Sequence, residues 1–402
     1  MTHRMLALLL TTALCPISTA GVNGSLETIG DITVLNLWGN WEEMGYAHGY
    51  LLGPDQKELF ETYFLEFAGG PGNIDLARLF LDAYFEIPDE FRSYAAGMVS
   101  GIADTVGTWS DVYGRDLDTL DLYLASAVPD ISHLIDAGYP LCSSISAWGE
   151  ATSADPDLLG EPGIARNLDY WVDEDLVLYD HHLLITYDPD DAQEWVSIGF
   201  SGLMGCLSGM NQAGVNGTID MGNHQGTYQT SSPFVPICMA LALGLCREDF
   251  DGSGSCDIDD LLEATTCWNR SNSYDVHCTG APGPSHPGEP AIVVEISNER
   301  GTAVRLATDE PAISTDRMIL TNHHRVLYPP VYCSRYTRLL DSLTANPVVG
   351  LERLWVLAGC AGTKTIPGLG GTIQTMIFMP SQMAMGVSFS DEAQASWQKS
   401  PE

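Results

Sequence analysis

One cysteine stands out for the chemistry that its neighbours along the chain can support. Cys142 opens the run Leu141-Cys142-Ser143-Ser144, and Arg166 and Asp169 follow it after an acidic, turn-rich segment. A cation beside a thiol favours the nucleophilic thiolate, and a carboxylate can hold that cation or an amine in place. These residues therefore predict a cysteine nucleophile with two charged supporting groups.

The three residues must be brought together by local structure. Residues with β propensity flank the turn segments 153–157 and 160–163, so the two arms are expected to form a β-hairpin. Arg166 and Asp169 are an odd number of positions apart, and a regular strand would turn them to opposite faces. We expect an irregularity near Leu168 that lets both reach the thiol.

The rest of the chain reads as a mixture of helices and strands. Apolar residues at helical spacing predict helices over 56–67, 76–85, 91–106, 235–246, 258–266 and 335–343. Short β-branched and aromatic runs predict strands over 176–187, 195–200, 215–221, 291–296, 303–307 and 372–378. The pattern alone supports a mixed α and β class.

Composition excludes some partners. The chain has 402 residues, 45% of them hydrophobic, which is enough for one large domain or one domain with insertions. Seventeen basic residues stand against 53 acidic ones, a formal net charge of -36. Nucleic acid and anionic membrane surfaces require a positive footprint, so neither is an expected partner, and polyanionic substrates are disfavoured.

Residues 1–20 resemble a secretory signal, with a short basic start, an apolar stretch and a small-residue cleavage site at Ser18-Thr19-Ala20. We therefore expect a secreted or periplasmic protein that is not embedded in a membrane. An oxidising compartment makes disulfides an expectation, and setting aside Cys15 and Cys142 leaves eight cysteines, an even number.

Further motifs recur in a fixed order along the chain. They are Glu43-Met44-Gly45 with Gly49, the Cys142 run, Ala165-Arg166-Asn167 with Asp169, Gly209-Met210-Asn211, Val293-Val294-Glu295, Thr321-Asn322-His323 and Ser334-Arg335-Tyr336. The glycines of the first motif are expected to permit close helix packing. Each is weak alone, but their order over roughly residues 31–390 resembles the peptidase C45 family of the N-terminal-nucleophile (Ntn) hydrolase superfamily. That family includes acyl-coenzyme A:6-aminopenicillanic acid acyltransferase, and bile salt hydrolase and penicillin V acylase are more distant relatives.

The resemblance implies an α+β fold, a four-layer αββα Ntn-hydrolase sandwich with a helical N-terminal segment. It also implies self-cleavage between Leu141 and Cys142, so that residues 21–141 become a helical α-subunit or propeptide and residues 142–402 the catalytic core. Cleavage frees the α-amine of Cys142, whose reference pKa of about 8 suits a general base near neutral pH. The two processed fragments would then stay associated.

The same resemblance assigns further site residues. Asn322 is expected to donate to the oxyanion, and Arg335 to stabilise the thiolate or the nearby carboxylate. Relatives carry a second oxyanion asparagine where this chain has Asp220 or Met221, and an ionised aspartate cannot donate. Asn223 or a backbone N–H is the alternative donor.

One insertion at about 246–278 carries a separate pattern. An EF-hand-like loop runs from Asp249 to Asp260, and it resembles the calcium loop of dockerin repeats. Its expected ligands are Asp249, Asp251, Ser253, Ser255, Asp257 and Asp260. We expect Ca2+ there as a structural ion, no cofactor for catalysis, and two disulfides among Cys246, Cys256, Cys267 and Cys278 that staple the insertion.

The leading hypothesis is a secreted, self-processing cysteine Ntn hydrolase that acts through an acyl-enzyme on a linear amide bond, peptide-like or not, of a small molecule. Two alternatives stay open. The acyl group could pass to an amine instead of water, or the chain could be a calcium-stabilised binding protein on a degenerate Ntn scaffold.

Overall fold

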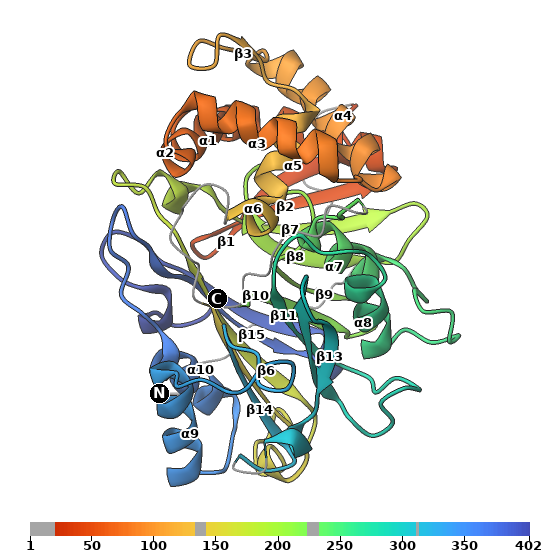
Figure 1. The fold of residues 1–402 in the computed structure, drawn as a ribbon, viewed down its shortest axis with the longest axis vertical. Coiled ribbons are helices and arrows are strands. Elements are labelled where there is room, and N and C mark those ends of the chain that lie inside the picture. Colours follow the sequence, from red (N-terminus) through yellow and green to blue (C-terminus); the bar gives the residue numbers. More distant parts are fainter. Residues whose placement is uncertain (1–20, 133–141, 223–232, 311–312) are drawn as a thin grey trace.

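The computed structural model describes residues 21–132, 142–222, 233–310 and 313–402. Two large sheets form its centre (Figure 1). The nine-stranded sheet has the order β1-β2-β7-β8-β9-β10-β11-β12-β13. Its strands are β1 (Gly24–Ile29), β2 (Ile32–Gly39), β7 (His182–Pro189), β8 (Trp195–Phe200), β9 (Ser208–Asn211), β10 (Asn216–Met221), β11 (Tyr274–Thr279), β12 (Ala291–Ser297) and β13 (Gly301–Arg305).

The five-stranded sheet has the order β14-β5-β6-β15-β16. Its strands are β5 (Ser143–Ala147), β6 (Gly163–Tyr170), β14 (Arg317–Thr321), β15 (Gly371–Met379) and β16 (Ala384–Phe389). Strands β5 and β6 pair antiparallel, so the hairpin predicted around Cys142 is confirmed. A short ribbon joins β3 (Trp109–Ser110) and β4 (Arg115–Asp116).

The helices fall into three groups. The first lies before the hairpin and contains α1 (Trp41–Glu61), α2 (Tyr63–Ala68), α3 (Pro71–Tyr84), α4 (Asp89–Thr105), α5 (Thr119–Ser126) and α6 (Val128–Ile131). The second contains α7 (Ile237–Cys246) and α8 (Ile258–Thr266), and the third α9 (Ser334–Ala345) and α10 (Leu351–Ala361). No helix within the described ranges is long and apolar enough to cross a membrane.

Buried apolar clusters define four layers. Val34 and Ile198 of the nine-stranded sheet pack with Met376 of the other sheet, so the two sheets face each other. The opposite face of the five-stranded sheet packs on α9 and α10 through residues such as Leu354, and α7 and α8 cover the nine-stranded sheet. The predicted αββα sandwich with a helical N-terminal segment is confirmed.

Strand β11 shows how the alternation of side chains builds these layers. Tyr274, Val276 and Cys278 join the apolar cluster that includes α7 and α8. Asp275 and His277 point the other way, as successive strand residues must. His277 hydrogen-bonds to serines of β5, so this second face meets the five-stranded sheet. Both faces are therefore buried, one apolar and one polar.

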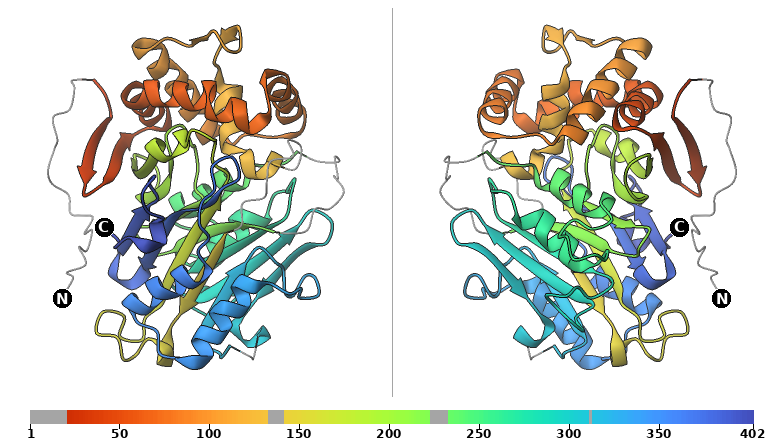
Figure 2. Two further views of the ribbon diagram at one scale, coloured as in Figure 1. Left: turned by 90° about the vertical axis from the view of Figure 1, so that its left-hand side faces the viewer. Right: turned by 90° about the vertical axis from the view of Figure 1, so that its right-hand side faces the viewer.

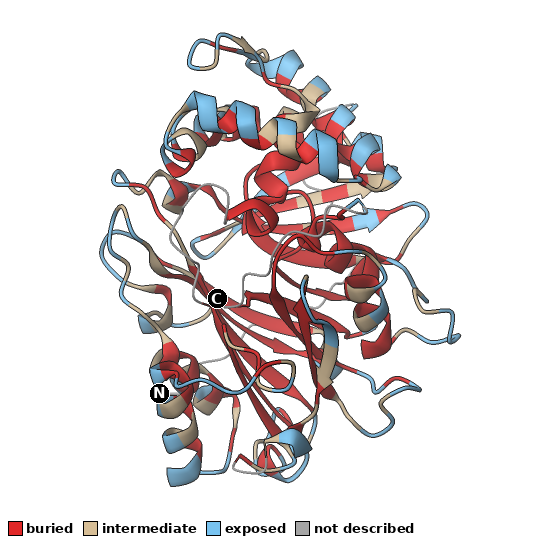
Figure 3. Ribbon diagram, viewed as in Figure 1, coloured by how far each residue is buried: buried red, intermediate tan, exposed pale blue. Residues whose placement is uncertain are grey.

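The helices α1–α5 form a cap at one end of the molecule, seen at the top of both views in Figure 2. The outer surfaces of this cap are exposed while the sheets beneath are almost wholly buried (Figure 3). Within the cap, α1 and α4 approach until their backbones touch. Added Cβ atoms at Gly45 and Gly49 would overlap the main-chain oxygens of Tyr94 and Met98. The helix-packing role predicted for these glycines is confirmed.

Some element predictions need correction. Residues 176–187 were expected as one strand, but a short 3-10 helix occupies Val177–His181 and β7 begins only at His182. Leu176 adopts a left-handed conformation (φ 58°), which interrupts an extended chain. Helix α10 and strand β1 were not foreseen from the pattern. The proposed subunit boundary falls within residues 133–141, outside the described residues, and stays a prediction.

Replacing Gly49 with alanine should destabilise the fold. The added methyl group meets backbone rather than a movable side chain, so we expect a loss of about 1–3 kcal/mol in the free energy of unfolding. Urea denaturation of Gly49→Ala beside Gly72→Ala measures this. Gly72 lies in α3 with nothing near its missing Cβ, and its variant should be unchanged or slightly more stable. Equal stabilities of the two variants would refute close α1–α4 packing.

Candidate active site

Cys142 stands immediately before β5, and only 2% of its surface is exposed. Ser144 of β5 lies opposite Arg166 of β6, and Ser143 lies opposite Asn167. This register brings the thiol beside the chain that carries Arg166 and Asp169, as the hairpin predicted.

Arg166 reaches from the five-stranded sheet into the space between the sheets. Its Nη2 lies 3.7 Å from the Cys142 sulfur, and its Nε lies 3.7 Å from Oδ1 of Asp220 on β10. The same guanidinium donates to Ser208 Oγ and to the main-chain oxygen of Ile219. Every one of these contacts is buried, so one arginine links the thiol to two strands of the opposite sheet.

Asp169 meets the cysteine from the other side. Its carboxylate accepts hydrogen bonds from Thr372 and Thr363 and lies 3.4 Å from Nη1 of Arg335. Its main-chain oxygen lies 3.6 Å from the Cys142 sulfur. The odd spacing from Arg166 thus does turn the two side chains to opposite faces.

The irregularity expected near Leu168 is present, but it lies in the partner strand. The pairing of β15 with β6 shifts between Thr372, opposite Asp169, and Gln374, opposite Leu168. Ile373 is the extra residue of this bulge, and bulges re-aim side chains next to them. Sequence reasoning missed Thr363 and Thr372, because no motif distinguishes two threonines far from the hairpin.

Asn322 and Arg335 join the same cluster. Arg335 donates to the main-chain oxygen of Cys142 at 2.6 Å and to Oδ1 of Asn322 at 2.6 Å. Asn322 Nδ2 donates to the main-chain oxygen of Met221 at 2.7 Å. Arg335 is buried, whereas Arg338, three residues on, is exposed, so the inward arginine of the Ser-Arg-Tyr-Thr-Arg stretch is Arg335.

Burial decides the protonation of the thiol in this single-chain form. It raises the pKa of Cys142 to about 12, and the charges of Asp220 and Asp169 oppose the favourable charge of Arg166. The sulfur is therefore a neutral thiol at neutral pH. The arginine alone does not make a thiolate here, and the reaction needs a base that accepts the thiol proton.

Asp220 belongs to a row of buried acids. Asp220, Asp275 and Glu295 lie directly opposite one another on β10, β11 and β12. His324 Nδ1 lies 2.9 Å from Asp275 Oδ1, and Arg305 Nε lies 3.2 Å from Glu295 Oε1. Sequence analysis assigned no chemistry to Asp275 or Glu295, although acids inside apolar strands were a visible signal.

Burial raises the pKa of the Asp220 carboxyl to about 7, with Arg166 lowering it and Asp275 raising it further. A substantial fraction is then neutral near pH 7, and a neutral carboxyl can donate a hydrogen bond. A protonated Asp220 can therefore donate a hydrogen bond to an oxyanion, although an ionised aspartate cannot. The alternative donor Asn223 and the cleavage residue Leu141 both lie outside the described residues, so neither is tested.

The other asparagines near the Gly209 turn have structural partners. Asn211 Oδ1 accepts from the main-chain N–H groups of Ala213 and Val215, which closes the turn. Asn216 Nδ2 donates to the main-chain oxygen of Gly209. Both side chains stabilise the loop between β9 and β10.

The acidic loop 249–260 is compact. Carboxylate oxygens of Asp249, Asp251 and Asp260 lie within 4.8 Å of one another, a spacing that could hold a metal ion. Asp260 also accepts main-chain N–H groups of Phe250 and Asp257, and Ser255 Oγ donates to Asp257. Ser253 donates its main-chain N–H to Asp251. The loop is preformed, while calcium itself stays a prediction.

The expected disulfides are not formed. All nine cysteines in the described part of the chain carry free thiols. Around the insertion each thiol has its own neighbours: Cys246 lies near the Leu243 carbonyl, Cys256 near Gln193 and Asn211, and Cys267 near the Ala264 carbonyl. The prediction that two disulfides staple this insertion is therefore wrong for this structure.

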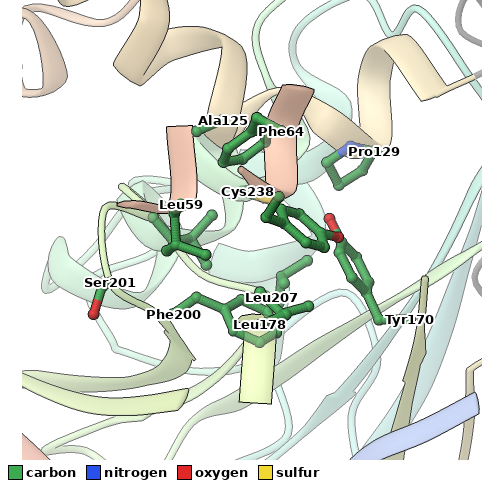
Figure 4. Close-up of a pocket in the computed structure, with 12 residues that line it drawn as sticks. Leu59, Phe64, Ala125, Pro129, Tyr170, Leu178, Phe200, Ser201, Leu207 and Cys238 are labelled. Atoms are coloured by element: carbon green, nitrogen blue, oxygen red, sulfur yellow. The ribbon is translucent and has the colours of Figure 1, made fainter. Parts of the chain in front are cut away.

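A small apolar pocket, partly open to solvent, lies near the cluster. Leu59 and Phe64 of the cap, Phe200 at the end of β8 and Tyr170 of β6 surround it (Figure 4). Tyr170 follows Asp169 directly, and burial and the nearby charges of Cys238 and Cys142 raise the pKa of its hydroxyl. The pocket thus has mainly apolar walls, and Tyr170 connects it along β6 to Asp169.

Comparison with known proteins gives distant matches. No family profile matches the chain. An uncharacterized protein of Archaeoglobus fulgidus is 25% identical over 204 residues, covering 47% of this chain and 32% of that protein. Protein dcd1B of Dictyostelium discoideum is 29% identical over 205 residues, covering 47% of this chain and 39% of that protein. The matched parts thus span less than two fifths of the length of each of these curated relatives.

Three solved structures are similar. A Caenorhabditis elegans ortholog of N-acylethanolamine-hydrolyzing acid amidase has a TM-score of 0.44 and 14% identity, covering 65% of this chain and 99% of that one. Penicillin V acylase from Agrobacterium tumefaciens has a TM-score of 0.39 and 12% identity, covering 62% and 83%. A mutant conjugated bile acid hydrolase from Clostridium perfringens has a TM-score of 0.39 and 12% identity, covering 62% and 90%. These likenesses say nothing about chemistry, which has to be judged from the site, and the C45 relationship stays a prediction.

The raised pKa of Asp220 predicts a pH-dependent stability. The Asp220 carboxyl has a pKa of about 7 in the folded state and a reference pKa of 3.8. Between these two values the folded state binds the proton more tightly than the unfolded state, so the free energy of unfolding falls as the pH rises through this interval. We expect Asp220→Asn to gain stability relative to the wild type between about pH 4 and about pH 7, and the difference to level off above that.

Urea denaturation across this pH range measures the difference. Asp175→Asn, at an exposed position, is the matched control for the loss of one carboxylate. Wild-type and Asp220→Asn curves that run parallel over the whole range would contradict the raised pKa.

Proposed function

We propose that the chain is a self-processing Ntn cysteine hydrolase that cleaves linear amide bonds of small molecules. The observation that carries the proposal is the position of Cys142, a buried thiol held between the Arg166 guanidinium on one side and the Asp169–Arg335 pair on the other. A nucleophile, an orienting carboxylate and two fixed cations around one carbonyl-sized position are the groups that acyl transfer requires.

The protonation of the thiol explains why processing would matter. The sulfur is neutral in the single chain, and no histidine is recorded in contact with it among the described residues. Scission before Cys142 creates an α-amine on the same residue, with a reference pKa of about 8. That amine accepts the thiol proton as the sulfur attacks the substrate carbonyl carbon.

The reaction then has two balanced halves. The amine returns its proton to the leaving nitrogen as the C–N bond breaks, which leaves a thioester on Cys142. Water next attacks the thioester carbonyl, the amine takes a proton from that water, and the acid product leaves as the thiol is restored. Asn322, which Arg335 and the Met221 carbonyl hold in place, is the donor that we propose for the oxyanion.

The apolar pocket suggests the kind of acyl group. Its aliphatic and aromatic lining begins beside Tyr170, so an apolar acyl chain fits it better than a charged one. The strongly acidic chain also disfavours polyanionic substrates. We therefore propose small amides with an apolar acyl part.

Two alternatives remain from the sequence. The acyl group passes to an amine when water is kept from the thioester, which makes the protein an N-acyltransferase. A chain that neither cuts itself nor turns over amides is a binding protein on the same scaffold. Export after removal of residues 1–20 is part of the proposal as well, and those residues lie outside the described structure.

Replacing Cys142 with alanine should abolish both processing and turnover. We expect the wild type to appear by intact mass as two fragments, one beginning at Cys142, and the variant to stay whole. Activity is measured on an N-acylethanolamine, penicillin V and a conjugated bile acid, the compounds for which the similar solved structures are named. Adding an acceptor amine distinguishes acyl transfer from hydrolysis.

Cys267→Ser is the matched control, because Cys267 is an exposed thiol away from the site, and it should process normally. A whole wild-type chain without turnover would favour the binding protein. A wild type that is cut elsewhere, or a Cys142→Ala variant that is still cut, would contradict self-processing at this residue.

We also propose that the loop 249–260 binds Ca2+ as a structural ion through the residues named from its spacing. Calcium at 100 times its dissociation constant would add about 2.7 kcal/mol to the stability of the bound form. The melting temperature should therefore rise with Ca2+ and fall with chelator. Asp251→Asn should remove this response, and Mg2+ should not reproduce it. A melting temperature that ignores Ca2+ would refute the site.

A further inference from the structure

A histidine and two acids from three separate segments meet inside the sandwich. Asp275 on β11 and Glu295 on β12 are cross-strand partners, and His324 follows β14. All three side chains are fully buried. Two carboxylate oxygens and one ring nitrogen, one atom from each residue, all lie within 4.8 Å of one another. The fold therefore gathers, away from solvent, the donor types that hold divalent metal ions in proteins.

Both acids converge on the same ring nitrogen. His324 Nδ1 lies 2.9 Å from Asp275 Oδ1 and 4.0 Å from Glu295 Oε2. A proton on Nδ1 points in one direction, so it serves Asp275 and leaves Glu295 beyond hydrogen-bond length. A cation in the place of that proton contacts both carboxylates. Ligand atoms around a tetrahedral zinc ion lie about 3.3 Å apart, and small shifts of these side chains give that spacing.

Two carboxyl groups of this layer have oxygens without hydrogen-bond partners among the described residues. Oδ2 of Asp275 accepts no hydrogen bond, and neither oxygen of Asp220, the cross-strand neighbour of Asp275, accepts one. Both residues are fully buried, where a polar atom without a partner is costly. Because the Asp275 carboxylate already faces His324, its second oxygen is a further ligand atom at the cluster.

The charges of the layer also favour a cation. Arg166 lies beside Asp220, and Arg305 Nε lies 3.2 Å from Oε1 of Glu295, the oxygen other than the one near His324. Two arginines thus stand against the three carboxylates of Asp220, Asp275 and Glu295. A neutral imidazole leaves one of these negative charges unbalanced, and a buried charge without a partner is strongly unfavourable.

The surroundings hold the ligands in place. Glu295 Oε2 accepts the main-chain N–H groups of Val326 and Leu327. The His324 ring stacks on Tyr328, with 5.5 Å between the ring centroids. Contacts of this kind orient metal ligands and are part of a built metal site.

We propose that Asp275, Glu295 and His324 form a buried site for one divalent transition-metal ion, with Zn2+ as the best match. The neutral imidazole and the two carboxylates are its ligands. An imidazole ligand disfavours Ca2+ and Mg2+, which prefer oxygen atoms alone, so this site differs in chemistry from the loop 249–260. The ion is structural, and its binding does not depend on amide hydrolysis.

The ion would fasten a loop that belongs to the candidate active site. Asn322 lies two residues before His324 and bonds to the Met221 carbonyl and to Arg335. A metal bound to His324 ties this loop to β11 and β12. Because the ligands are buried, the ion enters as the chain folds and leaves slowly.

The metal content of the purified full chain tests the site. The parent chain and its variants all carry Asp251→Asn, which weakens the loop 249–260 as a competing site. Each is produced with zinc in the medium, treated with EDTA to strip weakly held ions, and analysed by inductively coupled plasma mass spectrometry. We expect about one zinc ion per parent chain and less than about a tenth of that in His324→Gln.

His323→Gln is the matched control, because it makes the same substitution one residue earlier. His323 is half-buried, and its Nδ1 lies 2.8 Å from the main-chain oxygen of Asn322. This variant should keep the zinc of the parent chain.

The parent chain loaded with Co2+ identifies the ligands even where His324→Gln fails to fold. Nine free thiols in the described part of the chain make sulfur the competing ligand. Nitrogen and oxygen ligands give visible d–d bands, whereas a thiolate adds a strong charge-transfer band in the near ultraviolet. We expect the d–d bands without the thiolate band.

A parent chain with less than about a tenth of a zinc ion would overturn the proposal and leave His324 as a protonated partner of the two acids. Zinc that stays unchanged in His324→Gln, or a thiolate band in the cobalt form, would overturn it too, because the ion is then held elsewhere.

Discussion

The contact of Arg166 with the opposite sheet is the interaction on which the site depends. A guanidinium buried between two sheets is tolerated only when its donors are satisfied and its charge is balanced. Ser208 and the Ile219 carbonyl accept hydrogen bonds from the guanidinium, and Asp220, 3.7 Å from Nε, balances its charge from the same nine-stranded sheet. The arginine therefore fixes how β5 and β6, and with them Cys142, sit against β9 and β10.

The polar layer around this arginine extends across the sandwich. Asp220, Asp275 and Glu295 lie side by side on three neighbouring strands. Their oppositely charged neighbours are, in the same order, Arg166, His324 and Arg305. Main-chain N–H groups of residues 325–327 complete the shell of Glu295. Such a layer stabilises little by itself, because desolvation offsets the ion pairs, but the loss of one member leaves a buried charge without a partner.

The cluster also explains why the Cys142 thiol is unreactive in the single chain. Burial and two carboxylates keep the Cys142 thiol neutral although an arginine is close. The surroundings of each sulfur, rather than its exposure, set its reactivity.

Residue types and spacing by themselves determined a mixed α and β class and the β5–β6 hairpin that brings Cys142 beside Arg166 and Asp169. The αββα arrangement and the inclusion of Asn322 and Arg335 in the site followed from the resemblance in the order of the motifs. These features are local or repeat in a set order, so the pattern of the chain reveals them. They also predicted the glycine contacts of α1, because a missing Cβ has few other uses inside a helix.

Only the tertiary structure decided how each side chain takes part. The bulge at Ile373 and the threonines that hold Asp169 come from segments far along the chain from the hairpin. The free thiols of the insertion, where disulfides were expected, likewise follow from where the fold puts each sulfur. Protonation depends on burial and on charges from several strands at once, and a linear sequence does not state which strands will be neighbours.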